Sequence, residues 1–134
     1  MKVVVHVDGG SRGNPGPAAV AAVATTADGE PLAERTQYIG ETTNNVAEYR
    51  ALLLGLALAR DLGAEEVEVV NDSELVAYQI GGEYKVKNAG LKPLFLEAMR
   101  ELRGFHKWSV RPVRREQNER ADELVNEALD EELA

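Results

Sequence analysis

Apolar residues recur along the chain with two periods, one typical of strands and one typical of helices. Runs rich in β-branched and small residues, bounded by turn residues, predict five strands at Val3–Val7, Ala18–Thr26, Leu32–Ile39, Val67–Val70 and Lys107–Val113. Apolar residues spaced three and four apart predict four helices over Val46–Leu62, Ser73–Ile80, Leu91–Leu102 and from Asn118 onward.

Turn signals indicate how these elements connect. Asp28-Gly29 is typical of a hairpin turn, and Gly63 is placed to end the Leu-rich helix before it. The first three strands should therefore form an antiparallel meander, whereas the helical connections after them imply parallel crossovers. We expect an α/β fold in which a mixed five-stranded sheet carries helices on its faces, within one domain of residues 1–134.

Composition narrows the possible classes of protein. The chain has no Cys, which excludes disulfides, thiolate metal sites and a Cys nucleophile. No apolar run approaches the ~18 residues that a membrane span needs, and the N-terminal ten residues are too polar for a secretory signal. We therefore expect a cytoplasmic protein with no membrane partner. We also expect it to be a monomer.

The charge is unevenly distributed. The net charge is −8, yet residues 85–115 hold nine basic and only two acidic residues. An acidic chain argues against binding nucleic acid, because phosphates would be repelled, whereas the basic segment is compatible with it. An ordinary solvated surface is the alternative, and charge alone leaves the choice open.

Four acidic residues lie where chemistry is expected. Asp8 and Asp72 follow the first and fourth strands, Glu48 lies near the start of the Leu-rich helix, and Asp122 lies one turn into the last helix. If the two strands are adjacent and parallel, their acids meet beyond the strand ends. Oxygen ligands alone suit Mg²⁺ or Mn²⁺, and two such ions can clamp a phosphodiester. Taken singly, each acid could instead be a turn, cap or solvated helix residue.

Four segments carry a resemblance to a known family: DGGSRGNPGPA at 8–18, TTNNVAEYRAL at 42–52, NDSELV at 71–76 and REQNERADELVNEA at 115–128. With them the chain resembles a type 1 ribonuclease H over nearly its whole length. The resemblance implies the ribonuclease H-like fold and hydrolysis of the RNA strand of an RNA–DNA hybrid. It also implies two divalent ions held by Asp8, Glu48, Asp72 and Asp122.

The same resemblance implies substrate-binding roles for eight flanking residues: Gly9, Gly10, Asn14, Thr43, Asn44, Asn45, Glu74 and Asn118. The two glycines would let the backbone approach RNA, and the first asparagine would lie near the substrate strands. Thr43 and Asn118 match positions that hold a DNA phosphate. Asn44, Asn45 and Glu74 match positions that contact bases or 2′-hydroxyls, and the 2′-hydroxyl distinguishes RNA from DNA. Turn or capping roles are the alternative for the asparagines.

Three features depart from the family pattern. Segment 81–90 replaces a basic, Trp-containing handle and keeps only two Lys, which predicts weaker hybrid binding. The loop before the last acid lacks the His that is usual in the family, and Arg115 lies nearest to its position. Because an Arg is always charged, it could only steer charge or aid product release. Glu41 stands where the phosphate pocket is often basic.

Two other functions stay open on the sequence. A hybrid-binding module that does not cleave would be favoured by loss of one acid, but all four are present. A DNA-directed nuclease or integrase could share the fold, since fold alone does not determine substrate. The segments at 8–18 and 42–52 favour the hybrid as substrate.

Overall fold

A computed structural model describes residues 1–134 and contains the nine predicted elements in the predicted order. They are β1 (Lys2–Ser11), β2 (Gly16–Thr26), β3 (Pro31–Thr42), α1 (Asn44–Asp61), β4 (Glu66–Asn71), α2 (Glu74–Ile80), α3 (Lys92–Arg103), β5 (Lys107–Pro112) and α4 (Glu119–Leu133), with a 3-10 turn at Arg115–Gln117 before α4. None of these helices combines the length and the apolar character that crossing a membrane requires.

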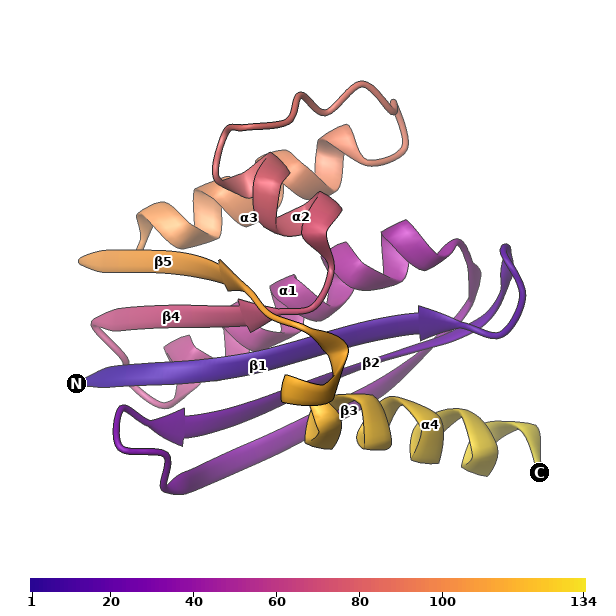
Figure 1. Cartoon of the computed structure of the whole chain (residues 1–134), viewed down its shortest axis with the longest axis horizontal. Helices are drawn as coiled ribbons and strands as arrows, with labels where there is room; N and C mark the ends of the chain where they lie inside the picture. The colour runs from indigo at the N-terminus through magenta and orange to yellow at the C-terminus, as the bar shows by residue number, and fades with distance from the viewer.

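The strands form one mixed sheet in the order β3-β2-β1-β4-β5 (Figure 1). β1, β2 and β3 pair antiparallel, while β1, β4 and β5 pair parallel. The predicted sheet is therefore confirmed. The predicted end of the first strand at Val7 is wrong: β1 pairs with β4 only as far as Val7, but its pairing with β2 continues to Ser11.

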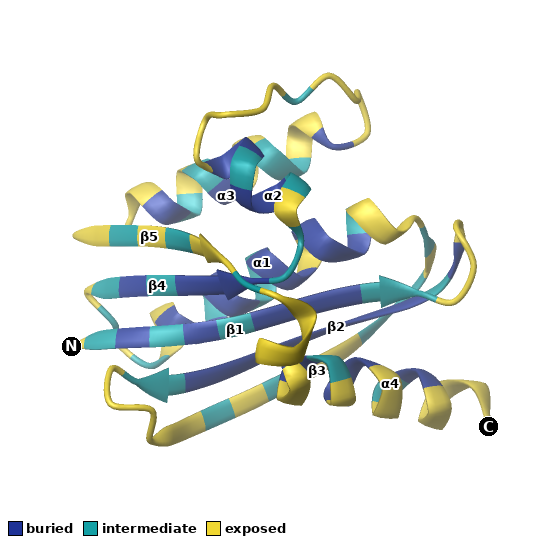
Figure 2. Cartoon of the chain, viewed as in Figure 1, coloured by how far each residue is buried: buried dark blue, intermediate teal, exposed yellow.

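The two faces of the sheet carry different helices. α1, α2 and α3 cover one face and α4 crosses the other (Figure 1). The larger core lies under the first three and includes Val3, Val5 and Val7 of β1. Alternate residues of β2 form a smaller core with the apolar side of α4, made of Ala19, Ala21, Val23, Ala121, Leu124, Val125 and Leu129. Burial is greatest along the central strands and least along β3 and β5 (Figure 2).

Capping residues define where α1 and α2 begin. The Thr43 hydroxyl accepts the N–H of Val46 at 3.3 Å, and the Ser73 hydroxyl accepts the N–H of Val76 at the same distance. Ser73 is therefore the cap of α2, and the alternative that Asp72 serves as this cap is wrong. The carboxylate of Asp72 is left available for other partners.

β1 and α1 approach each other closely at two glycines, Gly9 of β1 and Gly55 of α1. A Cβ atom placed on Gly9 would lie 2.2 Å from the carbonyl oxygen of Ala47, and one on Gly55 would lie 2.5 Å from Val7 Cγ1. Only glycine fits such contacts without moving the backbone. This approach brings Glu48, which follows Ala47, against the part of β1 that carries Asp8.

Candidate active site

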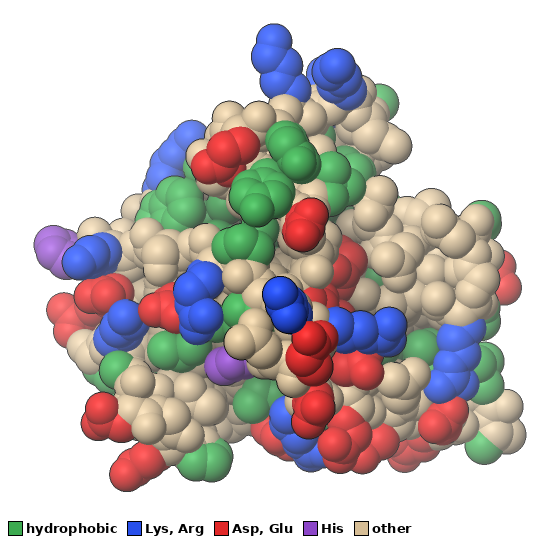
Figure 3. Space-filling model, in the orientation of Figure 1, with side chains coloured by type: hydrophobic (Ala, Val, Ile, Leu, Met, Phe, Trp, Pro, Cys, Tyr) green, Lys and Arg blue, Asp and Glu red, His purple; other side chains and the backbone are tan.

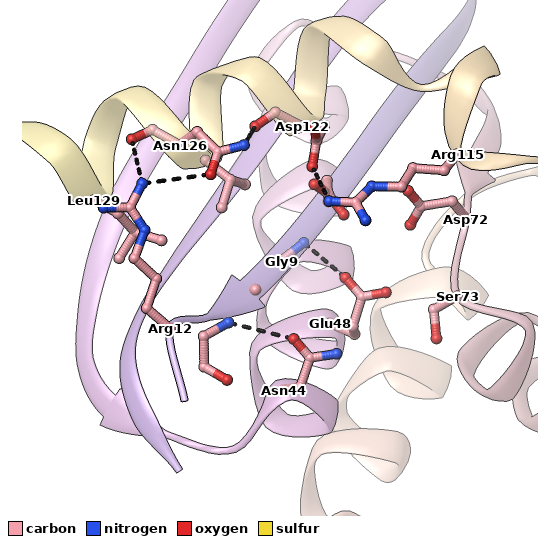
Figure 4. Close-up of a pocket in the computed structure, with 14 residues that line it drawn as sticks. Gly9, Arg12, Asn44, Glu48, Asp72, Ser73, Arg115, Asp122, Asn126 and Leu129 are labelled. Carbon is pink, nitrogen blue, oxygen red and sulfur yellow. Dashed lines mark hydrogen bonds and ion pairs between the residues drawn. The ribbon is translucent and has the colours of Figure 1, made fainter. Parts of the chain in front are cut away.

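Three carboxylates converge beside the end of β4. Asp8, Glu48 and Asp72 each offer an oxygen, and these oxygens all lie within 4.8 Å of one another. Asp8 and Glu48 are buried, with 7% and 5% of their surface exposed, and Asp72 is partly buried. Figure 4 shows that Glu48 and Asp72 reach this point from different elements.

The parallel register explains why two of these acids meet. Val7 of β1 is opposite Asn71, the last residue of β4, so Asp8 and Asp72 follow side by side. Asp8 lies within β1 rather than after it, because β2 keeps pairing there and opposes Asp8 with Ala21. Glu48 comes from the second turn of α1, and its Oε1 accepts the N–H of Gly9 at 2.7 Å.

Asp122 joins the pocket from α4, on the other face of the sheet. It lines the same pocket as the three carboxylates but is not one of the three whose oxygens lie within 4.8 Å of one another. The exposed Arg115 guanidinium donates to its Oδ1 at 3.2 Å, as Figure 4 shows. Arg115 thus connects the 3-10 turn to Asp122 of α4.

Burial and mutual repulsion change the acidity of the cluster. Burial, together with the charges of Glu48, Asp72 and Asp122, raises the pKa of Asp8 to about 9. Burial raises the pKa of Glu48 to about 8, although the hydrogen bond from Gly9 opposes the change. Burial also raises the pKa of Asp72, against the opposing hydrogen bond with Asp8 and the charge of Arg115.

This donor set fits a hard divalent cation. All the converging ligand atoms are carboxylate oxygens, the ligands that Mg²⁺ and Mn²⁺ prefer. At neutral pH the raised pKa values mean that buried acids retain protons unless a cation neutralises them. Residues Asp8, Glu48 and Asp72 could therefore hold a divalent metal ion, with the Asp122 carboxylate of α4 close to that of Asp8.

Several predicted substrate-binding residues surround the same pocket, an opening of about 380 Å³. Gly9, Gly10 and Asn44 line it. The Asn14 side chain accepts the N–H of Asn44 at 3.0 Å, and the Asn44 side chain accepts the N–H of Ser11 at 3.3 Å. These bonds fix the turn between β1 and β2 against the start of α1.

The remaining predicted residues differ in how accessible they are. Thr43 and Asn45 are exposed at the start of α1, and Glu74 is exposed at the start of α2 beside Asp72. Asn118 is only 2% exposed, and its Nδ2 donates to the carbonyl oxygen of Val7 at 2.8 Å. In this structure the Asn118 amide ties the start of α4 to β1, and its expected contact with a DNA phosphate stays a prediction.

Sequence reasoning missed four polar residues of the pocket, Ser11, Arg12, Ser73 and Asn126. Arg12 lies in the exposed turn between β1 and β2 and reaches across to α4. The only sequence feature that could have indicated a role for Arg12 is that it is a basic residue within a Gly-rich turn. Arg12 is a basic residue beside a largely acidic surface, since acidic side chains group over α4 and the middle of this face in Figure 3.

Several known proteins are similar to this chain in sequence. A family model described as reverse transcriptase-like matches residues 6–128. The chain is 50% identical over 131 residues to a bifunctional protein of Mycobacterium tuberculosis and 45% identical over 130 residues to ribonuclease HI of Halobacterium salinarum. Each match covers 97% of this chain, but 36% of the mycobacterial protein and 65% of the halobacterial one.

Solved structures match as closely. The crystal structure of RNase H1 from Halobacterium salinarum gives a TM-score of 0.96 at 45% identity, covering 98% of this chain and 99% of that one. LC11-RNase H1, solved in complex with an RNA/DNA hybrid, gives a TM-score of 0.94 at 44% identity, again covering 98% and 99%. The likeness extends over all the elements that build the pocket.

Proposed function

Because the chain belongs to the ribonuclease H family, we propose that it hydrolyses the RNA strand of RNA–DNA hybrids. The observation that carries this proposal is the convergence of three carboxylates, two of them buried, in a pocket that is open to a large ligand. The solved relative with a bound RNA/DNA hybrid supports the choice of substrate.

We propose that Asp8, Glu48, Asp72 and Asp122 hold two divalent ions, Mg²⁺ or Mn²⁺. Such a pair supplies an activated water and neutralises the charge that develops on the phosphate during in-line displacement. The N–H of Gly9 orients Glu48 for this role, and the guanidinium of Arg115 orients Asp122. Arg115 cannot take a proton from water, so its part is to position charge and to aid product release.

The polar residues around the carboxylates would select the substrate. Asn44 and Asn45 are exposed at the start of α1, where they can donate to and accept from base edges and 2′-hydroxyls. Glu74, whose carboxylate can only accept hydrogen bonds, can accept them from 2′-hydroxyls and base N–H groups at the start of α2. Gly9 and Gly10 line the pocket, and the absence of a side chain at Gly10 leaves this backbone within reach of a ribose. Thr43 precedes Asn44 of the pocket and Asn14 is bonded to it, so both would lie near the substrate strands.

A strand-labelled cleavage assay tests the proposal. The protein should cut the RNA strand of a hybrid with Mg²⁺ or Mn²⁺ and should not cut in EDTA. Asp72→Asn should abolish cleavage and still melt cooperatively, whereas Asp28→Asn, the same change in an exposed turn, should leave the rate unaltered.

Other outcomes of this assay point to other functions. Equal cleavage of an all-DNA duplex would indicate a DNA-directed nuclease or integrase, and tight hybrid binding without cleavage would indicate a binding module. A monomeric state, a cytoplasmic location and a single domain spanning residues 1–134 stay predictions. Gel filtration of the purified protein tests the first of these.

A further inference from the structure

Two cationic side chains line the carboxylate pocket. The role proposed above, positioning charge and aiding product release, involves only Arg115. Arg115 pairs with Asp122, whereas Arg12 comes from the turn between β1 and β2. Figure 4 shows the two arginines on opposite sides of Glu48. A nucleic acid strand lying along the pocket would meet both.

The guanidinium of Arg12 contacts only exposed groups of α4. Its Nη2 lies 2.7 Å from Asp130 Oδ1, and it donates weakly to the backbone and side-chain oxygens of Asn126 at 3.4 and 3.5 Å. The side chains of Arg12 and Asp130 are 40% and 68% exposed. Ion pairs exposed to this degree contribute little to stability, so another anion can replace Asp130.

The turn does not need this ion pair to keep its shape. The N–H of Arg12 donates to the carbonyl oxygen of Pro17 at 2.8 Å, and Asn44 is bonded to both Ser11 and Asn14. These bonds hold the turn on both sides of Arg12. The guanidinium is therefore free to change partners while the backbone that presents it stays in place.

The surrounding charge makes a cation at this end of the pocket useful. α4 carries the acids Asp122, Glu123, Glu127 and Asp130, of which Asp122 pairs with Arg115 and both glutamates pair with the single cation Arg120. A polyanion approaching these acids is repelled, and Arg12 is the basic residue that lines the pocket on this side. The planar fork of a guanidinium matches the oxygens of a phosphate.

We propose that Arg12 binds a backbone phosphate of the nucleic acid strand that enters the carboxylate pocket, and that Asp130 competes with this phosphate in the free protein. The proposal rests on the proposed function, since it requires nucleic acid in the pocket. It makes Arg12 a substrate-binding residue and Asp130 a negative regulator of affinity.

Opposite effects of two substitutions test this pairing. With a labelled hybrid, Arg12→Ala should raise KM about tenfold, the lower range for a hydrogen bond to a charged group, with a smaller effect on kcat. It should also reduce the slope of log KM against log KCl concentration by about one, as expected for one lost phosphate contact. Asp130→Asn should lower KM by about two- to fivefold, and Arg12→Lys should recover part of the loss.

A second surface ion pair provides matched controls. Arg35 and Asp61 also lie 2.7 Å apart, with 37% and 55% of their side chains exposed, and neither lines the pocket. Arg35→Ala and Asp61→Asn therefore correct for a changed net charge and a lost surface pair. Their KM values should stay within twofold of the wild-type value.

A turn-fixing role for the Arg12–Asp130 pair predicts the contrary result. Both substitutions would then raise KM by similar factors and leave the salt slope unchanged, which would overturn the proposal. If the wild type cleaves hybrids and the Arg12 and Asp130 variants match the Arg35 and Asp61 controls, the proposal alone fails. If the wild type does not cleave, the proposed function fails, and hybrid affinity measured by fluorescence anisotropy on the same variants still tests Arg12.

Discussion

Asp8, Glu48 and Asp72 lie close enough for their charges to oppose folding when no cation neutralises them. Replacing Asp8 with Asn removes one of these acids and nearly preserves its shape. We expect Asp8→Asn to melt at a higher temperature than the wild type at pH 7 in EDTA. Most substitutions of a buried residue destabilise a protein, so the sign of this change is diagnostic.

The pKa of Asp8 gives the size of the effect. The folded-state value is about 9 and the ordinary value is 3.8, so the folded protein retains a proton that the unfolded chain has released. The stability linked to this proton is fully present below pH 3.8 and is lost as pH rises toward 9, by about 1.4 kcal/mol per pH unit. At pH 7 the loss reaches about 4 kcal/mol at most, and sharing of protons among the three acids reduces it.

We therefore expect Asp8→Asn to gain between about 1 and 4 kcal/mol at pH 7 in EDTA, with each kcal/mol worth about 4 °C in Tm for a domain of this size. The gain should shrink as the pH falls and vanish near pH 4, where Asp8 is protonated in both states. Asp28→Asn, in the exposed turn between β2 and β3, is the matched control and should show no such pH-dependent gain.

A divalent metal ion should reverse which of the two proteins has the higher Tm. A ligand that binds only the folded state stabilises it by mass action, by about 2.7 kcal/mol at a hundred times its Kd. Mg²⁺ or Mn²⁺ should therefore raise the Tm of the wild type more than that of Asp8→Asn. If the variant is less stable in EDTA at pH 7 and responds to metal as the wild type does, Asp8 is a structural residue of β1 and not a metal ligand.

Three further predictions concern other parts of the molecule. Arg115→Ala should lower kcat at saturating hybrid by about tenfold, because Asp122 loses its partner at 3.2 Å; an unchanged kcat would exclude this role. Raising KCl from low to molar concentration should raise the Tm, since the chain outside residues 85–115 holds 21 acidic and six basic residues whose repulsion salt screens; a flat Tm would contradict this. Gly9→Ala should destabilise the fold by about 2 kcal/mol or more in denaturant melts, because the added Cβ would lie 2.2 Å from the oxygen of Ala47; an unchanged midpoint would show that β1 and α1 can separate freely.

The local elements of this fold could be read from the sequence because their causes are local. Alternating and helical spacing identified the strands and helices, and Gly63, which marks the end of α1 in the sequence, adopts a positive φ of 80°. The antiparallel opening and the parallel crossovers followed from the turns and helices between the strands. The four acids were singled out partly by their place beside strands and partly by the family resemblance.

Tertiary structure alone decided how those residues meet. Asp8 lies inside β1 because β2 continues to pair beyond the end of β4, and no feature of residues 1–11 encodes that longer neighbour. Asn118 is buried against Val7, 111 positions away, and Arg12 reaches Asp130 across the pocket. Periodicity along the chain reports which side of an element is buried, but it carries no information on which distant residue lies opposite. That choice is made when the helices pack on both faces of the sheet, since packing fixes the strand register and the position of α4 together.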